Sequence, residues 1–165
     1  MKTKKDINQL AWINEYLHLR IRKKNIKSTL MFILYWNILE HLVCDDNFNI
    51  NSIRQKISIK RLSQIDFIEY YTHFRHRYVS NGVVTRQFDL LMFRSENDKQ
   101  YVKNCFQNNN PTDEEAISSL FLVIQRLRNN IFHGLKEIEV LEVQEPNFKN
   151  ANAAIVTFLE LIRNN

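Results

Sequence analysis

The chain has 165 residues, the usual size of one globular domain, and is long enough to bury a substantial apolar core. Hydrophobic residues make up 44% of it and 11 residues are phenylalanine, a composition that excludes intrinsic disorder. Only 2 glycines and 2 prolines occur, which argues against a β-sandwich or barrel and against the glycine-rich phosphate loops of nucleotide-binding enzymes.

The formal net charge is +5, from 23 Lys and Arg against 18 Asp and Glu. A net positive charge of this size is expected of a protein that binds a polyanion. It is equally expected of a protein whose charged side chains are only solvated by water. Cys44 and Cys105 lack CxxC spacing and predict buried thiols of a reducing cytosol, not a disulfide or zinc framework. No apolar run approaches the roughly 18 residues that span a bilayer, and no signal-peptide core follows the charged start, so we expect a soluble, cytoplasmic protein.

Helical periodicity predicts an all-α fold, a single-domain helical bundle over residues 1–165 with one core. The expected helices are Ile7–Lys24, Lys27–Val43, Gln64–Val79, Phe88–Phe93, Glu96–Phe106, a helix after Thr112 that carries Ile117, Leu120, Ile124, Leu127 and Ile131 on one stripe, and a last helix from about Asn147. The segment Lys27–Val43 is apolar on most sides, which favours a place in the middle of the bundle. The pattern of residues Ile50–Lys60 does not distinguish one type of secondary structure from another. The pattern of Ile138–Val143 predicts a short strand or an extended connector.

Short polar signals mark the ends of these helices. Asp6 and Ser95 stand where N-caps belong, and Thr112 with Glu115 forms the pattern of a capping box. The signals for a turn, a break and a helix stop are Ser80-Asn81-Gly82, Asn108-Asn109-Asn110-Pro111 and Gly134.

Most constellations that carry enzyme chemistry are missing from the sequence. No carboxylate cluster suits a two-metal nuclease, and neither a nucleophile elbow nor a Cys–His pairing is present, so we expect no metal and no cofactor. The basic and aromatic segment Thr72–Tyr78, which includes Arg75 and Arg77, predicts either a contact with a phosphate backbone or a solvated helix face.

A second candidate lies late in the chain, where Arg128, Asn129 and His133 fall on one flank of a helix, opposite its apolar stripe. Three polar groups that converge outside the core contact of the helix are compatible with a functional site. The alternative is a surface arginine followed by a histidine that caps the end of the helix.

One segment late in this helical chain is Leu127-Arg128-Asn129-Asn130-Ile131-Phe132-His133-Gly134. With it, the chain resembles the HEPN superfamily, and most closely its Apea-like branch. The hallmark of that family is Arg, a polar residue, three variable residues and His, which Arg128, Asn129 and His133 match. The aromatic stretch Phe32–Glu40, with its embedded acid, is similar to a helix of the same branch. Leu135 stands where some HEPN toxins carry a modified Tyr, so this chain departs from that form of control.

The resemblance implies a metal-independent endoribonuclease that acts as a homodimer with a composite active site, in a toxin–antitoxin or antiphage system with a partner protein. It implies Arg128 and His133 as catalytic residues, with Asn129 orienting His133 or binding RNA. The residues expected to bind RNA are Arg126, Lys136, Asn130, Arg75 and Arg77. For Arg126, the sequence is equally consistent with a plain surface charge. The alternative within the family is a non-catalytic module that binds RNA or another protein.

Overall fold

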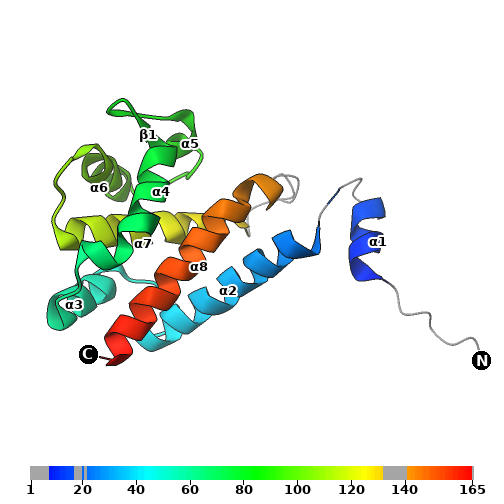
Figure 1. Ribbon diagram of the computed structural model, residues 1–165, viewed down its shortest axis with the longest axis horizontal. Coiled ribbons are helices and arrows are strands. Elements are labelled where there is room, and N and C mark those ends of the chain that lie inside the picture. Colours follow the sequence, from blue (N-terminus) through cyan, green and yellow to red (C-terminus); the bar gives the residue numbers. More distant parts are fainter. Residues whose placement is uncertain (1–7, 17–19, 21, 132–140, 165) are drawn as a thin grey trace, which may run out of the picture.

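The computed structural model describes residues 8–16, 20, 22–131 and 141–164. Within these, the chain folds into helices with one two-stranded hairpin, which confirms the all-α prediction (Figure 1). The elements are α1 (Gln9–Tyr16), α2 (Lys23–Val43), α3 (Ile50–Lys60), the 3₁₀ turn η1 (Gln64–Phe67), α4 (Ile68–Tyr78), β1 (Val79–Ser80), β2 (Val83–Val84), α5 (Arg86–Asp89), α6 (Glu96–Gln107), α7 (Asp113–Ile131) and α8 (Leu141–Asn164).

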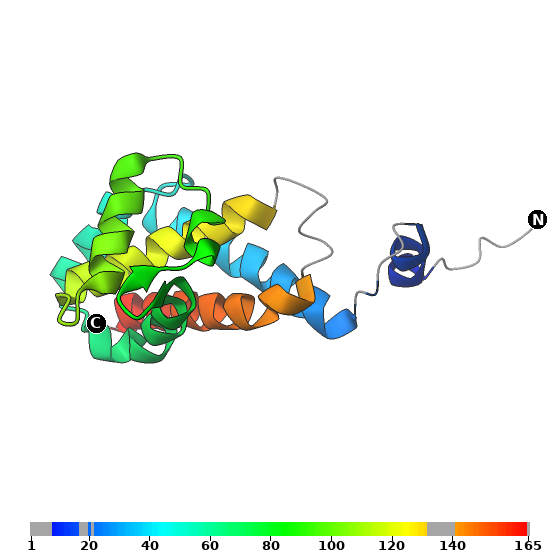
Figure 2. The ribbon, with the colours of Figure 1, turned by 90° about the horizontal axis from the view of Figure 1, so that it is seen from above.

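Helices α2 and α8 lie side by side along the molecule, and α7 packs against α3, α4 and α6 (Figures 1 and 2). The buried apolar side chains form one cluster that runs from α2 to α8. Helix α7 is its centre, because no residue from Ala116 to Ile124 is more than 2% exposed. The predicted stripe of α7 is therefore confirmed, but it is only part of a segment that is buried on every side.

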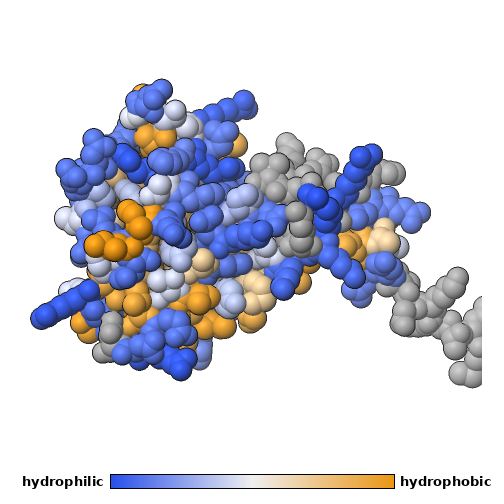
Figure 3. Space-filling view, in the orientation of Figure 1, coloured by the Kyte–Doolittle hydropathy of each residue, from blue (hydrophilic) through white to orange (hydrophobic). Residues whose placement is uncertain are grey.

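Helix α2 occupies the outside of the bundle, so its predicted central position is wrong. Phe32, Trp36 and Leu39 face the core, whereas the other side of the helix exposes apolar residues, with Leu30 at 60% and Leu42 at 62%. Figure 3 shows apolar side chains among the hydrophilic ones in the lower part of the body, over α2 and α8. An apolar composition on all sides did not distinguish a central helix from one with an uncovered apolar face.

The first predicted helix also differs from the structure. Instead of one helix over Ile7–Lys24, α1 covers Gln9–Tyr16 and α2 already begins at Lys23, while Arg20 and Arg22 are not helical. Helix α1 lies apart from the other helices in Figures 1 and 2 and buries none of its residues. Asp6, the expected N-cap, lies outside the described residues.

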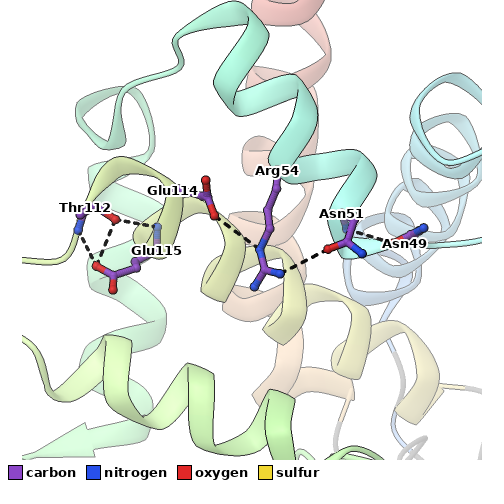
Figure 4. A network of polar contacts seen from close by, with 6 residues as sticks. All are labelled: Asn49, Asn51, Arg54, Thr112, Glu114 and Glu115. Atoms are coloured by element: carbon purple, nitrogen blue, oxygen red, sulfur yellow. Dashed lines mark hydrogen bonds and ion pairs between the residues drawn. The ribbon is translucent and has the colours of Figure 1, made fainter.

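The predicted caps are confirmed where the structure describes them. The Ser95 hydroxyl accepts a hydrogen bond from the Asp98 N–H at 3.2 Å. At the start of α7, the Glu115 carboxylate accepts from the Thr112 N–H at 2.8 Å, and the Thr112 hydroxyl accepts from the Glu115 N–H at 3.2 Å (Figure 4). This reciprocal pairing satisfies N–H groups that the helix itself leaves without partners.

The ambiguous segment 50–60 is helix α3. The Asn49 side chain caps it by accepting from the Asn51 N–H at 2.9 Å. In Figure 4, Arg54 extends from α3 to Glu114 on α7, with Nε and Oε1 3.7 Å apart, so this ion pair joins the two helices.

The turn predicted at Ser80-Asn81-Gly82 is confirmed as a two-residue hairpin. Val79 pairs with Val84 and Ser80 with Val83, while Asn81 and Gly82 have φ of 50° and 76°. Positive φ at both central residues is the requirement that an Asn-Gly pair meets with little strain.

The last helix begins at Leu141, before the predicted start near Asn147, and includes Pro146. Residues 141–143 are therefore helical, and the prediction of a strand or extended connector there is wrong. A short apolar run has too few residues for its period to separate a strand from a helix. Residues 138–140 and Gly134 lie outside the described part of the chain.

The capping box predicts a measurable loss of stability on truncation. Thr112→Ala should lower the free energy of unfolding by about 1 kcal/mol, because the N–H of Glu115 loses its acceptor. The matched control is Ser58→Ala on the exposed side of α3, which should change it by less than about 0.5 kcal/mol. Urea unfolding measures both, and equal values for the two variants would contradict the cap.

A second prediction concerns alkaline pH. Burial raises the pKa of the Cys105 thiol to about 11 and that of the Tyr78 phenol to about 12. In the unfolded chain these groups ionise near their ordinary pKa values of about 8.5 and 10, so above about pH 9 the unfolded state binds fewer protons than the folded one. Stability is then lost as pH rises toward 11 and 12. The melting temperature of the wild type should fall steadily above pH 9, and that of Cys105→Ala should fall less steeply. A melting temperature that stays constant from pH 8 to 11 would contradict this prediction.

Candidate functional site

The end of α7 holds the motif arginine at the surface. The Arg128 side chain is 34% exposed, and its Nη1 donates to the Asn129 side-chain oxygen at 3.1 Å. Its Nη2 lies 3.8 Å from Oε2 of Glu40, on α2. The structure therefore brings together two of the predicted site residues and one acid from a distant part of the chain.

Glu40 is the site residue that sequence reasoning did not assign. Its side chain is 15% exposed, and Oε1 accepts from the Phe48 N–H, 3.3 Å away, in the loop between α2 and α3. The signal was present in the sequence, because Glu40 is the embedded acid of the aromatic stretch Phe32–Glu40. An acid inside an apolar helix commonly has a cationic partner, but the sequence did not show which one.

Arg126 has a different role from the predicted one. It is 5% exposed, Nε donates to the Leu91 carbonyl at 2.9 Å, and Nη2 donates to the Met92 carbonyl. Burial, together with the nearby positive charge of Arg94, lowers the pKa of Arg126. The predictions of a phosphate-positioning residue and of a plain surface charge are both wrong, since the guanidinium is used to fasten the turn after α5 to α7.

Asn130 and Arg77 come together, from α7 and α4, at the rim of one hollow. This hollow has a volume of about 230 Å³, and Tyr78, Leu90 and Leu127 are among its other lining residues. The Asn130 amide donates to the Leu90 carbonyl at 3.2 Å, so it also holds the turn that Arg126 fastens. Two of the residues predicted to bind RNA thus share one surface, beside the end of α7.

Arg75 does not line that hollow. Its Nε donates to the Phe106 carbonyl at 2.8 Å, and Nη2 donates to the Asn109 side chain at 2.9 Å, at the end of α6. The basic and aromatic segment Thr72–Tyr78 is therefore not one continuous face, because its aromatic residues Phe74 and Tyr78 are buried.

The remaining predicted site residues, His133 and Lys136, lie outside the described residues. In the part that the structure describes, no group of three or more His, Cys, Asp or Glu side chains is arranged to hold a metal ion. Both cysteines are free and buried, as predicted, and burial raises the pKa of each thiol. No helix among these residues is both long and apolar enough to cross a membrane.

Comparison with models of known protein families, with curated proteins and with solved structures found no match. The resemblance to the HEPN superfamily therefore depends on the residues of this chain alone.

The two arginines of α7 should respond differently to truncation. Arg126→Ala should lower the free energy of unfolding by about 3 kcal/mol, because the buried Leu91 carbonyl and the partly buried Met92 carbonyl both lose a charged donor. Arg128→Ala should cost about 1 kcal/mol or less, because its ion pair is long and partly exposed to water. Urea unfolding of the two variants measures the difference, and equal losses would contradict the assignment of Arg126 to the scaffold.

Proposed function

We propose that this protein is a metal-independent endoribonuclease of the HEPN type. The observation that carries the proposal is the cluster of Arg128, Asn129 and Glu40 at the exposed end of α7. The same segment continues in the sequence to His133, which completes the Arg-polar-x3-His pattern. A net charge of +5 is the sign expected of a protein that binds RNA.

The proposed reaction is an internal transesterification of RNA. His133 removes the proton of a 2′-OH, that oxygen attacks the adjacent phosphorus, and the 5′-oxygen leaves and takes up a proton. The products are a 2′,3′-cyclic phosphate and a 5′-hydroxyl. Imidazole suits this role because its ordinary pKa of about 6.5 lies near working pH, and such proton transfer contributes about 10²–10⁴-fold.

Arg128 supplies positive charge where the phosphorane-like transition state gains negative charge. Its planar guanidinium presents parallel donors to phosphate oxygens, a geometry that Lys does not reproduce. Glu40 is a positioning residue in this scheme, because its carboxylate lies beside one terminal nitrogen of Arg128 while Asn129 binds the other.

The remaining parts of the proposal come from the resemblance and from the cysteines. Two copies of the chain would bring two Arg128–His133 motifs into one cleft, with a partner protein controlling activity in a toxin–antitoxin or antiphage system. We place the reaction in the cytoplasm, since free, buried thiols are typical of a reducing compartment.

RNA cleavage by the purified full-length chain tests the proposal. Arg128→Ala and His133→Ala should each reduce cleavage of end-labelled single-stranded RNA by about 100-fold or more, and Arg128→Lys should be nearly as damaging. The matched control is Arg163→Ala near the end of α8, where the side chain is 77% exposed; it should cut like the wild type. A chelator should leave wild-type activity unchanged.

Three outcomes would overturn the ribonuclease proposal. Folded Arg128 or His133 variants that cut normally would remove the motif from the reaction. Loss of wild-type activity with the chelator would replace it with a metal-dependent mechanism. RNA that binds the wild type without being cut would favour the non-catalytic RNA-binding module.

A further inference from the structure

A second hollow, larger than the one lined by Asn130, is lined on α7 by residues that precede Arg128. Its volume is about 570 Å³, and it lies between the loop that joins α2 to α3, the start of α6 and the middle of α7. The lining residues that bear on its chemistry are Asp45, Asn47, Phe48, Asp98, Leu122 and Gln125. A space of this size is in the range of sites that bind small organic groups.

The hollow and the Arg128–Glu40 pair are connected through α7 and through the loop that follows α2. Gln125, which lines the hollow, lies three residues before Arg128, a rise of about 4.5 Å along α7. Cys44, which also lines it, comes directly after α2, and its N–H donates to the Glu40 carbonyl at 2.9 Å. Phe48 connects the two directly, because it lines the hollow and its N–H donates to the Glu40 carboxylate. A ligand in the hollow would therefore lie next to the proposed site.

The walls combine an aromatic ring with hydrogen-bonding groups. Phe48 stacks on the buried Trp36, with ring centroids 5.1 Å apart, so its ring is held in place. Leu122 supplies an apolar floor, while Asn47 and Gln125 carry amides that both donate and accept. Planar, polar-edged groups are recognised by such combinations of stacking and hydrogen bonding.

The charge of the walls distinguishes a base from a phosphate. Asp45 and Asp98 line the hollow, and neither Lys nor Arg is among its lining residues. Carboxylates repel a phosphate and accept hydrogen bonds from exocyclic amino groups. The chemistry of the hollow thus suits a neutral base that carries an amino group, and it does not suit the backbone of the RNA.

We propose that this hollow binds one unpaired, amino-bearing base of the RNA (adenine, cytosine or guanine, in preference to uracil) beside the bond that is cut. The inference depends on the proposed function for its substrate. Asp98 accepts from the amino group of the base, Gln125 reads a second position on its edge, and Phe48 contacts its face. The base fixes the register of the strand, so that the neighbouring phosphate reaches Arg128.

Nucleoside binding tests the hollow without any cleavage. Cytidine and uridine differ at one position, where cytidine has an amino group and uridine an oxygen. In a titration of the ¹⁵N-labelled full-length chain, cytidine should shift the amide signals of Phe48 and Gln125, and uridine should bind at least about fivefold more weakly. Asp98→Asn should weaken cytidine binding by a similar factor, while the control Asp66→Asn, on the exposed side of η1, should not. Equal binding of the two nucleosides, or no shifts at these residues, would overturn the proposal.

Cleavage of a random-sequence RNA pool separates this proposal from the ribonuclease proposal. The wild type should cut with uracil depleted at one position flanking the scissile bond. Asp98→Asn should lose that depletion, whereas the control Asp66→Asn should keep it. Cleavage with no preference at either flanking base would overturn the base site and leave the ribonuclease standing. Cytidine shifts without any RNA cleavage would support the hollow as a base site and overturn the ribonuclease.

Discussion

The complete burial of the middle of α7 is the constraint on which the rest of the structure depends. Nine consecutive residues, Ala116–Ile124, exclude water, which requires neighbours on every side of the helix. Helices α3, α4 and α6 supply them, and α8 adds the contact of Phe158 with Phe121 at 4.8 Å between ring centroids. Beyond Leu127 the helix leaves the core, and Arg128, Asn129 and Asn130 become partly exposed. The candidate site lies where that surrounding shell ends.

Local signals in the sequence predicted local structure well. The capping box at Thr112, the cap at Ser95 and the Asn81-Gly82 turn each depend on contacts within a few residues, so the sequence contains all the groups involved. Which helix is the most deeply buried could not be predicted in the same way. Helix α2 is more apolar than α7 around its circumference, yet it is α7 that lies at the centre, because position in a bundle depends on how all helices share their apolar faces.

In the candidate site, the burial of single side chains could not be predicted from the sequence either. Arg126 and Arg128 are two residues apart on one helix, and nothing in their spacing distinguishes them. Their partners distinguish them. Arg126 donates to backbone carbonyls of the turn after α5, and tertiary packing brings that turn close to α7. Arg128 lies beside an acid on α2. A buried cation persists only where such acceptors surround it. The motif therefore drew attention to one turn of the helix, and the fold shows that Arg126 is buried there while Arg128 reaches the surface.

Glu40 makes the candidate site and the larger hollow mechanically dependent on each other. One oxygen of its carboxylate accepts the N–H of Phe48 in the wall of the hollow, and the other lies beside Arg128. In the proposed complex, a base in contact with Phe48 would therefore act on the same carboxylate that lies beside the guanidinium. Small displacements of a charged group alter how well it meets a transition state, even when binding itself is unchanged. In the proposed reaction, a base held at the hollow would therefore affect the rate through Glu40 without taking part in the chemistry, which would join recognition of the base to catalysis.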